Sequence, residues 1–295
     1  MTAANGTATV APAPAAGACA EVSAQVSAQV SAEDFARRGY VILRGVLDAP
    51  EVERARALCS GYLTGTGSQE MLTSDFLADD FLAGIVLRER VVRAAKELLG
   101  EDHPVLYPNC TARKNVYVPW HVDATFVGPT ASYVWEPGFA HVQCGLYLQD
   151  NDPVGGGGID VVRASHLMSF DGYGTTEAEF DIPARTVGES DLRERVDTRA
   201  GDVVMWNARL MHTSTTVLRD PGREKFGVFF SYARPHVRDN HRFLSQIAVD
   251  SMRTMNGVSR LIPRLAEIAR MRYPESFPAW FAQGATDAGV RIPTL

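Results

Sequence analysis

A histidine and an aspartate are separated by a single residue in the segment VPWHVDATF, residues 118–126. If this segment is a β-strand, His121 and Asp123 point to the same face, about 7 Å apart at ~3.3 Å per residue. Their side chains could then converge on one metal ion. A plain histidine–aspartate hydrogen bond on a strand explains the pair equally well, so a third ligand has to decide.

The segment GDVVMWNARLMHTS, residues 201–214, supplies that candidate. We expect one long strand that begins at the Gly201–Asp202 turn and ends in His212. Two histidines and one carboxylate form the facial triad of non-haem Fe(II), which leaves three coordination positions open for a co-substrate and O₂. A zinc site with one open position is the competing interpretation.

An arginine and a hydroxyl follow the second histidine. Ser214 is two positions past His212 and so shares its face of a strand, and Arg223 lies across the turn LRDPGRE. In an antiparallel hairpin, Arg223 would return alongside His212, where its guanidinium could bind the distal carboxylate of a dicarboxylate co-substrate with help from Ser214. A surface arginine in a charged turn is the alternative.

The rest of the chain predicts the elements that position these residues. Residues 1–30 are a low-complexity tail, VSAQVSAQVSAE included, that we expect to be disordered. Residues 31–295 then form a single α+β domain: a helix ending at Gly39, a strand over 40–47, helices from Asp48 to Gly100, a β core over about 104–235, and a helical segment over about 240–285. Short strands separated by glycine and proline turns indicate an antiparallel sandwich or barrel.

Composition excludes several other classes of protein. The net charge of −6 gives no basic face for nucleic acid, and no apolar run is long enough to span a membrane. The four cysteines form no C-x-x-C pair, which favours reduced thiols in a cytoplasmic protein. The apolar stripe over 258–272 could pack on the barrel or on a second subunit of a homo-oligomer.

The ordered set of H-x-D, a glycine turn followed by VVxxSH, GDVVxxxxxxxH-x-S and an arginine resembles the phytanoyl-CoA dioxygenase family over about residues 31–235. The resemblance implies a double-stranded β-helix (a cupin-like jelly roll) flanked by N- and C-terminal helices. It also implies Fe(II), 2-oxoglutarate and O₂ as cofactor and co-substrates, with iron on His121, Asp123 and His212. The distal carboxylate of 2-oxoglutarate would lie on Arg223 and Ser214. Because Asp123 is present, the halogenation of relatives that lack this carboxylate is not expected.

The sequence departs from the family pattern at two places. The usual P-G-S-H turn reads Arg163-Ala164-Ser165-His166, and Gly145 stands near a position that often carries tryptophan. The walls around the co-substrate and the substrate are therefore specific to this chain. We expect the substrate wall to include the aromatic residues nearest the metal motif, Trp120, Phe126, Trp135 and Tyr147.

The function predicted from this resemblance is a dioxygenase that oxidises an unactivated C–H bond of a small organic substrate in bacterial specialised metabolism. Hydroxylation is the first expectation, and desaturation, epimerisation and cyclisation are the others. Two rivals stay open: a 2-oxoglutarate-independent, cupin-like hydrolase or isomerase, and a non-enzymatic jelly-roll binding module. Turnover without 2-oxoglutarate would favour the first rival, and failure to bind any metal would favour the second.

Overall fold

The helices begin and end at residues that cap them. The computed structural model describes residues 30–123, 138–167, 191–215, 222–236 and 276–293. Helix α1 (Ala32–Arg38) begins after Ser31, whose hydroxyl accepts a hydrogen bond from the Asp34 N–H at 3.0 Å, and ends at Gly39 in the left-handed conformation. Further along the chain lie α2 (Ala49–Thr66), α3 (Thr73–Ala78), α4 (Asp80–Val86), α5 (Glu89–Leu99) and α10 (Ala279–Asp287).

The ends of two helices agree with the sequence. A capping box formed by Asp48 and Glu51 begins α2, and Gly100 ends α5 as expected. The helical stretch predicted over 70–100 is divided among α3, α4 and α5. Most of the predicted C-terminal segment, residues 237–275, and the tail of residues 1–29 lie outside the described residues.

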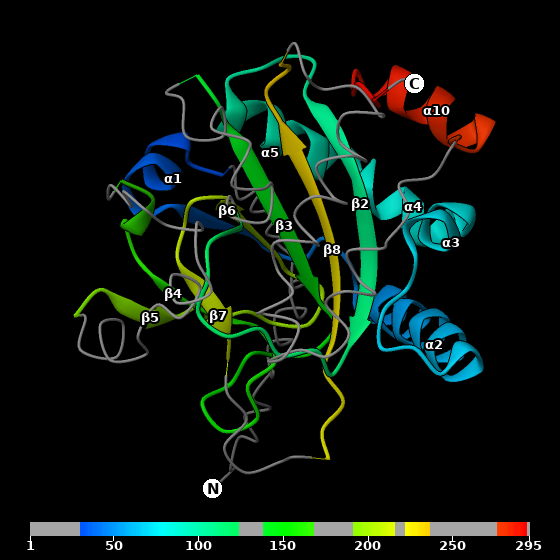
Figure 1. Cartoon of the computed structure of the whole chain (residues 1–295), viewed down its shortest axis with the longest axis horizontal. Helices are drawn as coiled ribbons and strands as arrows, with labels where there is room; N and C mark the ends of the chain where they lie inside the picture. Colours follow the sequence, from blue (N-terminus) through cyan, green and yellow to red (C-terminus); the bar gives the residue numbers. More distant parts are fainter. Residues whose placement is uncertain (1–29, 124–137, 168–190, 216–221, 237–275, 294–295) are drawn as a thin grey trace, which may run out of the picture.

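The strands form two antiparallel sheets, so the predicted α+β jelly-roll class is confirmed. Five strands pair in the order β1-β6-β3-β8-β2, and three pair in the order β5-β4-β7. Figure 1 shows the long strands of the larger sheet in the middle of the molecule, with the smaller sheet to one side of them and α2, α3 and α4 to the other. The strands are β1 (Tyr40–Leu43), β2 (Val105–Lys114), β3 (His141–Tyr147), β4 (Ile159–Val162), β5 (Arg193–Arg195), β6 (Val203–Asn207), β7 (His212–Ser214) and β8 (Phe226–Ala233), with a 3₁₀ turn at Ser165–Leu167.

Strand alternation divides the core into two layers. On β6, Val203 and Met205 pack in the cluster that includes the helices, whereas Val204 and Trp206 pack in a second cluster with Ile159 of the smaller sheet. The second cluster also contains Tyr40, Tyr147, Val161, Val196 and Leu210. The space between the two sheets is therefore the inside of the jelly roll.

Three predictions about strands were wrong. Residues 201–214 do not form one strand: β6 belongs to the larger sheet, and β7, which carries His212, belongs to the smaller one. Consequently β7 does not form a hairpin with the strand after Arg223, because β7 pairs with β4 and β8 pairs with β2 and β3. The strand expected over 40–47 ends at Leu43.

Across the described segments, we find no helix both long and apolar enough to cross a membrane. Cys59, Cys110 and Cys144 are buried free thiols, as the scattered cysteine pattern predicts, while Cys19 lies in the segment that the structure does not describe. Burial raises the pKa of the Cys59 and Cys110 thiols to about 12, which keeps them protonated.

Candidate metal centre

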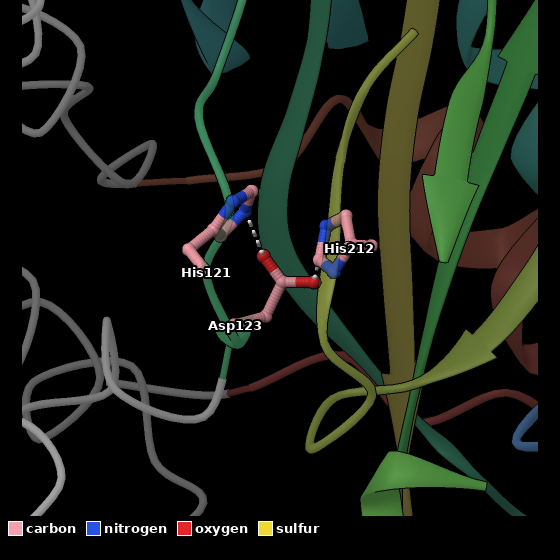
Figure 2. Close-up of side chains that lie close together, drawn as sticks. All are labelled: His121, Asp123 and His212. Atoms are coloured by element: carbon pink, nitrogen blue, oxygen red, sulfur yellow. Dashed lines mark ion pairs between the residues drawn. The ribbon is translucent and has the colours of Figure 1, made fainter. Parts of the chain in front are cut away.

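The two histidines and the aspartate meet inside the jelly roll. His121 and Asp123 come from the segment that follows β2, and His212 is the first residue of β7; Figure 2 shows the three side chains directed at one another. The Nε2 atoms of His121 and His212 each lie 3.5 Å from a different oxygen of the Asp123 carboxylate. One ligand atom from each residue lies within 4.8 Å of the others, a spacing that could hold a metal ion.

A backbone bridge fixes the spacing of the histidines. The N–H of each donates to the C=O of the other, both at 2.9 Å, and their ring centroids are 4.1 Å apart. His121 is thus held in an isolated bridge rather than in the regular strand that the sequence suggested. The bridge joins two segments far apart in the chain, so the site depends on the fold and not on the H-x-D spacing alone.

Both imidazole rings are oriented by backbone carbonyls. His121 Nδ1 lies 2.6 Å from the Pro119 C=O, and His212 Nδ1 lies 2.9 Å from the Leu210 C=O. Because a carbonyl oxygen can only accept, Nδ1 carries the proton in each ring. In the neutral rings, Nε2 then carries the lone pair and lies on the side of Asp123, and metal-binding histidines usually have their other ring N–H bonded in this way.

The third ligand is held by a residue that the sequence analysis missed. Trp206 on β6 donates its indole Nε1–H to Asp123 Oδ2 at 2.7 Å. Gly145 on β3 makes room for this ring, since a Cβ there would lie 3.0 Å from the indole. A tryptophan among apolar strand residues gives no sign of such a contact in sequence, because the contact depends on the register between β3 and β6.

The electrostatics suit a divalent cation. Burial by itself would raise the pKa of Asp123, but His212, His121 and the indole N–H outweigh it, so the pKa is below its ordinary value and the group is a carboxylate. Burial, reinforced by His121, lowers the pKa of His212 to about 4, so its ring is neutral near pH 7. One carboxylate and two neutral imidazoles match the donor set of non-haem iron.

The interior beside the three residues contains an unsatisfied polar group. Tyr147 on β3 is fully buried, and within the described segments its hydroxyl has no hydrogen-bond partner. Burial raises its pKa, the Asp123 carboxylate raises it further, and the Arg113 guanidinium acts in the opposite direction. A buried hydroxyl without a partner is costly, so the Tyr147 hydroxyl would be stabilised by a polar ligand in this part of the interior.

The two residues expected at the co-substrate differ in their placement. Ser214 lies at the end of β7, and its hydroxyl accepts a hydrogen bond from the Val118 N–H at 3.0 Å. Arg223 is engaged elsewhere: its guanidinium pairs with the Asp152 carboxylate and lies 3.3 Å from the Asp150 C=O. The structure therefore brings Ser214 close to the segment that carries His121 and Asp123. It holds the Arg223 side chain against the loop before the glycine turn.

The aromatic residues expected at the substrate also lie in different places. Tyr147 faces the interior, whereas Trp120 packs with Val122, Val162 and Met211 in a separate cluster and lies under Arg193. Phe126 and Trp135 lie outside the described residues. His166 has a structural contact, with its Nε2 3.0 Å from the Ala36 C=O of α1.

Comparison with known proteins gives this geometry its context. The family model of phytanoyl-CoA dioxygenase (PhyH) matches residues 35–223, more than half of the chain. The chain belongs to this family. The resemblance seen in the sequence is thereby confirmed, although no curated protein matches the chain significantly by sequence.

Solved structures share the fold of this PhyH-family protein. The epimerase SnoN, in complex with Fe³⁺, alpha ketoglutarate and nogalamycin RO, has a TM-score of 0.52 and 22% identity over 68% of this chain and 81% of its own. The carbocyclase SnoK of nogalamycin biosynthesis has a TM-score of 0.54 and 20% identity over 72% and 88%. HygX from Streptomyces hygroscopicus, with nickel and 2-oxoglutarate bound, has a TM-score of 0.52 and 16% identity over 69% and 86%. At these identities the likeness concerns the fold.

Proposed function

We propose that this protein is a non-haem Fe(II)- and 2-oxoglutarate-dependent dioxygenase that oxidises a C–H bond of a small organic substrate. The observation that carries the proposal is the trio of His121, Asp123 and His212, with both Nε2 lone pairs and an ionised carboxylate facing one point. Membership of the PhyH family favours this function over a zinc hydrolase or a metal-free binding module.

Fe(II) bound by the trio, together with 2-oxoglutarate and O₂, supplies an oxidant strong enough to remove hydrogen from an unactivated carbon. The chain's own part is to orient and to enclose. Carbonyls hold both imidazoles in the metal-binding tautomer, and Trp206 holds one oxygen of Asp123. His212 is buried, so this ligand is enclosed by the protein and its position is fixed before any substrate binds.

The reaction type is proposed as hydroxylation first, with desaturation, epimerisation and cyclisation as alternatives. SnoN is an epimerase and SnoK a carbocyclase, so this fold supports outcomes other than hydroxylation. We place the enzyme in a tailoring step of bacterial specialised metabolism, since SnoN and SnoK, which share the fold, belong to nogalamycin biosynthesis. A cytoplasmic location is proposed from the free thiols.

The test is anaerobic titration of the purified protein with Fe(II), with and without 2-oxoglutarate. We expect a visible charge-transfer band only when both are present, and its loss in Asp123→Ala. Thermal melting of this variant checks that the fold is retained. A variant that binds Fe(II) normally and keeps the band would overturn the assignment of the trio. If the native protein binds Fe(II) but shows no band with 2-oxoglutarate, the metal site is supported and 2-oxoglutarate is excluded as the co-substrate.

A further inference from the structure

A row of polar side chains crosses the inner face of the larger sheet, where β6, β3, β8 and β2 lie side by side (Figure 1). Gln143 on β3 is paired with Trp206 on β6 and with Ser231 on β8. Ser231 is paired in turn with Tyr107 on β2. Trp206 packs in the cluster between the two sheets, so its cross-strand neighbours face the same interior. His141, two residues before Gln143 on β3, shares this face. We call Tyr107, His141, Gln143 and Ser231 the inner row.

The interior is open beside the inner row. Strands β3 and β8 are buried along their whole length except at Gln143 and Phe229, which are partly exposed. The opposite face of both strands is covered by the cluster that includes the helices. Phe229 packs against the cluster that contains Trp206, so it faces the interior as Gln143 does. A small molecule can therefore reach the Gln143 carboxamide from between the sheets.

The inner row begins next to the metal ligands. The Trp206 indole donates to Asp123 Oδ2 at 2.7 Å, and its ring centroid lies 5.1 Å from that of His212. Directly opposed residues of an antiparallel pair have Cβ atoms about 5 Å apart, so Gln143 is one strand away from Trp206. His141 is about 7 Å further along β3 at ~3.3 Å per residue. A substrate with a C–H bond at the metal position would thus extend over these side chains.

His141 lacks the partners that a buried imidazole needs. It is 4% exposed, and within the described residues neither Nδ1 nor Nε2 has a hydrogen-bond partner. Tyr107 stacks on its ring with 4.6 Å between centroids, and Phe139 meets it edge-on at 5.9 Å. Burial lowers the pKa of His141 to about 4, although Asp123 acts in the opposite direction, so the ring is neutral near pH 7. A neutral imidazole has one N–H donor and one acceptor nitrogen, and here both are unpaired.

The other members of the inner row are also uncharged. In the part of the chain that the structure describes, the Gln143 carboxamide makes no hydrogen bond, so its oxygen and its NH₂ group are both available to a ligand. Ser231 is fully buried and donates its hydroxyl to Asn109 Oδ1 at 3.1 Å. The row therefore offers hydrogen-bond donors and acceptors without an ionised group.

These properties select among possible substrates. An alkyl chain on the inner row would leave the Gln143 carboxamide and both His141 nitrogens without partners, which is unfavourable for each buried group. An anionic group would find no cation in the row. A hydroxyl group, in contrast, both donates and accepts, and a carbonyl oxygen accepts from the Gln143 NH₂ group or from the His141 N–H.

We propose that Gln143 and His141 bind a neutral, oxygen-bearing part of the substrate, so that the substrate is an uncharged hydroxylated or keto compound and not an alkyl chain. The inference rests on the proposed function, because it presumes that a C–H bond of this compound is oxidised at His121, Asp123 and His212. By holding the oxygen-bearing part, the two side chains determine which carbon lies at the metal position.

The first measurement is thermal melting of Gln143→Leu and His141→Phe. Since neither polar group is bonded within the described residues, we expect both variants to melt at or above the native temperature. Gln149→Leu is the matched control, because the Gln149 carboxamide bonds the C=O groups of Gly157 and Phe226 and the Phe226 N–H, and this variant should melt lower. A fall in both Gln143→Leu and His141→Phe as large as in the control would overturn the proposal, by showing that the two groups support the fold.

The second measurement is ligand-detected NMR of the full-length, Ni(II)-loaded protein with 2-oxoglutarate, which does not turn over. The probes are cyclic ketones, lactones and methyl glycosides, each paired with its deoxygenated counterpart, together with hexanoate, octanoate and decanoate as alkyl chains. We expect oxygenated probes to bind, and Gln143→Leu and His141→Phe each to weaken them about 5- to 100-fold, as for a lost hydrogen bond that leaves a buried partner unpaired.

Three results of the NMR titrations would overturn the proposal. The first is equal or tighter binding of the deoxygenated probes or the alkanoates, and the second is no binding of any oxygenated probe. The third is binding of the oxygenated probes to both variants within about threefold of the native affinity. The Fe(II)–2-oxoglutarate charge-transfer band distinguishes these results from failure of the proposed function. It should persist in both variants, whereas its absence in the native protein would contradict the proposed function itself.

Discussion

Replacing Trp206 with phenylalanine tests whether the indole sets the metal site. The change removes the Nε1–H that donates to Asp123 Oδ2 at 2.7 Å and keeps an aromatic ring between the sheets. A hydrogen bond to a charged group contributes about 1.5–3 kcal/mol, which corresponds to roughly 10- to 150-fold in an equilibrium constant. Loss of a partner of a metal ligand typically costs 10–100-fold in metal affinity. We therefore expect Fe(II) to bind about 10- to 100-fold more weakly in Trp206→Phe.

The assay is anaerobic Fe(II) titration in competition with a chromophoric chelator, combined with thermal melting of the metal-free protein. Trp280→Phe is the matched control, because Trp280 lies on α10, is 44% exposed, and packs on Phe281. A small loss of stability is expected in Trp206→Phe from the smaller ring. If Trp206→Phe melts normally and binds Fe(II) within threefold of the native protein, the indole does not orient Asp123 and the reasoning is refuted.

Two further outcomes follow from the packing around the metal ligands. Gly145→Ala places a methyl group 3.0 Å from the Trp206 ring. We therefore expect a loss of about 1–3 kcal/mol in the free energy of unfolding, and weaker Fe(II) binding. Native values for both would show that the Trp206 ring does not pack tightly on position 145. Ser165→Ala removes the buried hydroxyl that accepts from the Met211 N–H at 2.8 Å, and denaturant unfolding should show a loss of about 1–3 kcal/mol; an unchanged midpoint would show that water replaces the hydroxyl.

The trio could be predicted from sequence because local chemistry specifies much of it. His121 and Asp123 are close for any extended backbone. His212 lies where a largely apolar segment gives way to polar residues, which is typical of the end of a buried strand. The caps of α1 and α2 were likewise predictable, since Ser31 and Asp48 act on neighbouring N–H groups. Such features depend on a few adjacent residues and not on how the sheets pair.

Contacts that depend on sheet pairing could not be predicted. Residues 203–211 are apolar except for Asn207 and Arg209, and these two polar residues alone do not reveal that the chain leaves the larger sheet after Asn207 and enters the smaller one at His212. The Trp206–Asp123 hydrogen bond has the same origin: it requires β6 to lie beside β3 with Gly145 under the ring. The short β5 strand, Arg193–Arg195, was missed because its residues are charged and mostly exposed.

Arg223 and Lys225 illustrate how the choice of reference residue decides a prediction. Counting forward from His212 crosses a turn whose path the sequence does not specify, and spacing of that kind selects Arg223. Counting backward from β8 uses a ladder in which Gly227 opposes both Arg113 and Tyr147, so the interior face is known and continues to Lys225. Two residues earlier the chain has passed the end of the sheet, where Asp152 binds Arg223. The closer a residue lies to a strand of the jelly roll, the more deeply its side chain is enclosed, and Lys225 is accordingly buried whereas Arg223 is partly exposed.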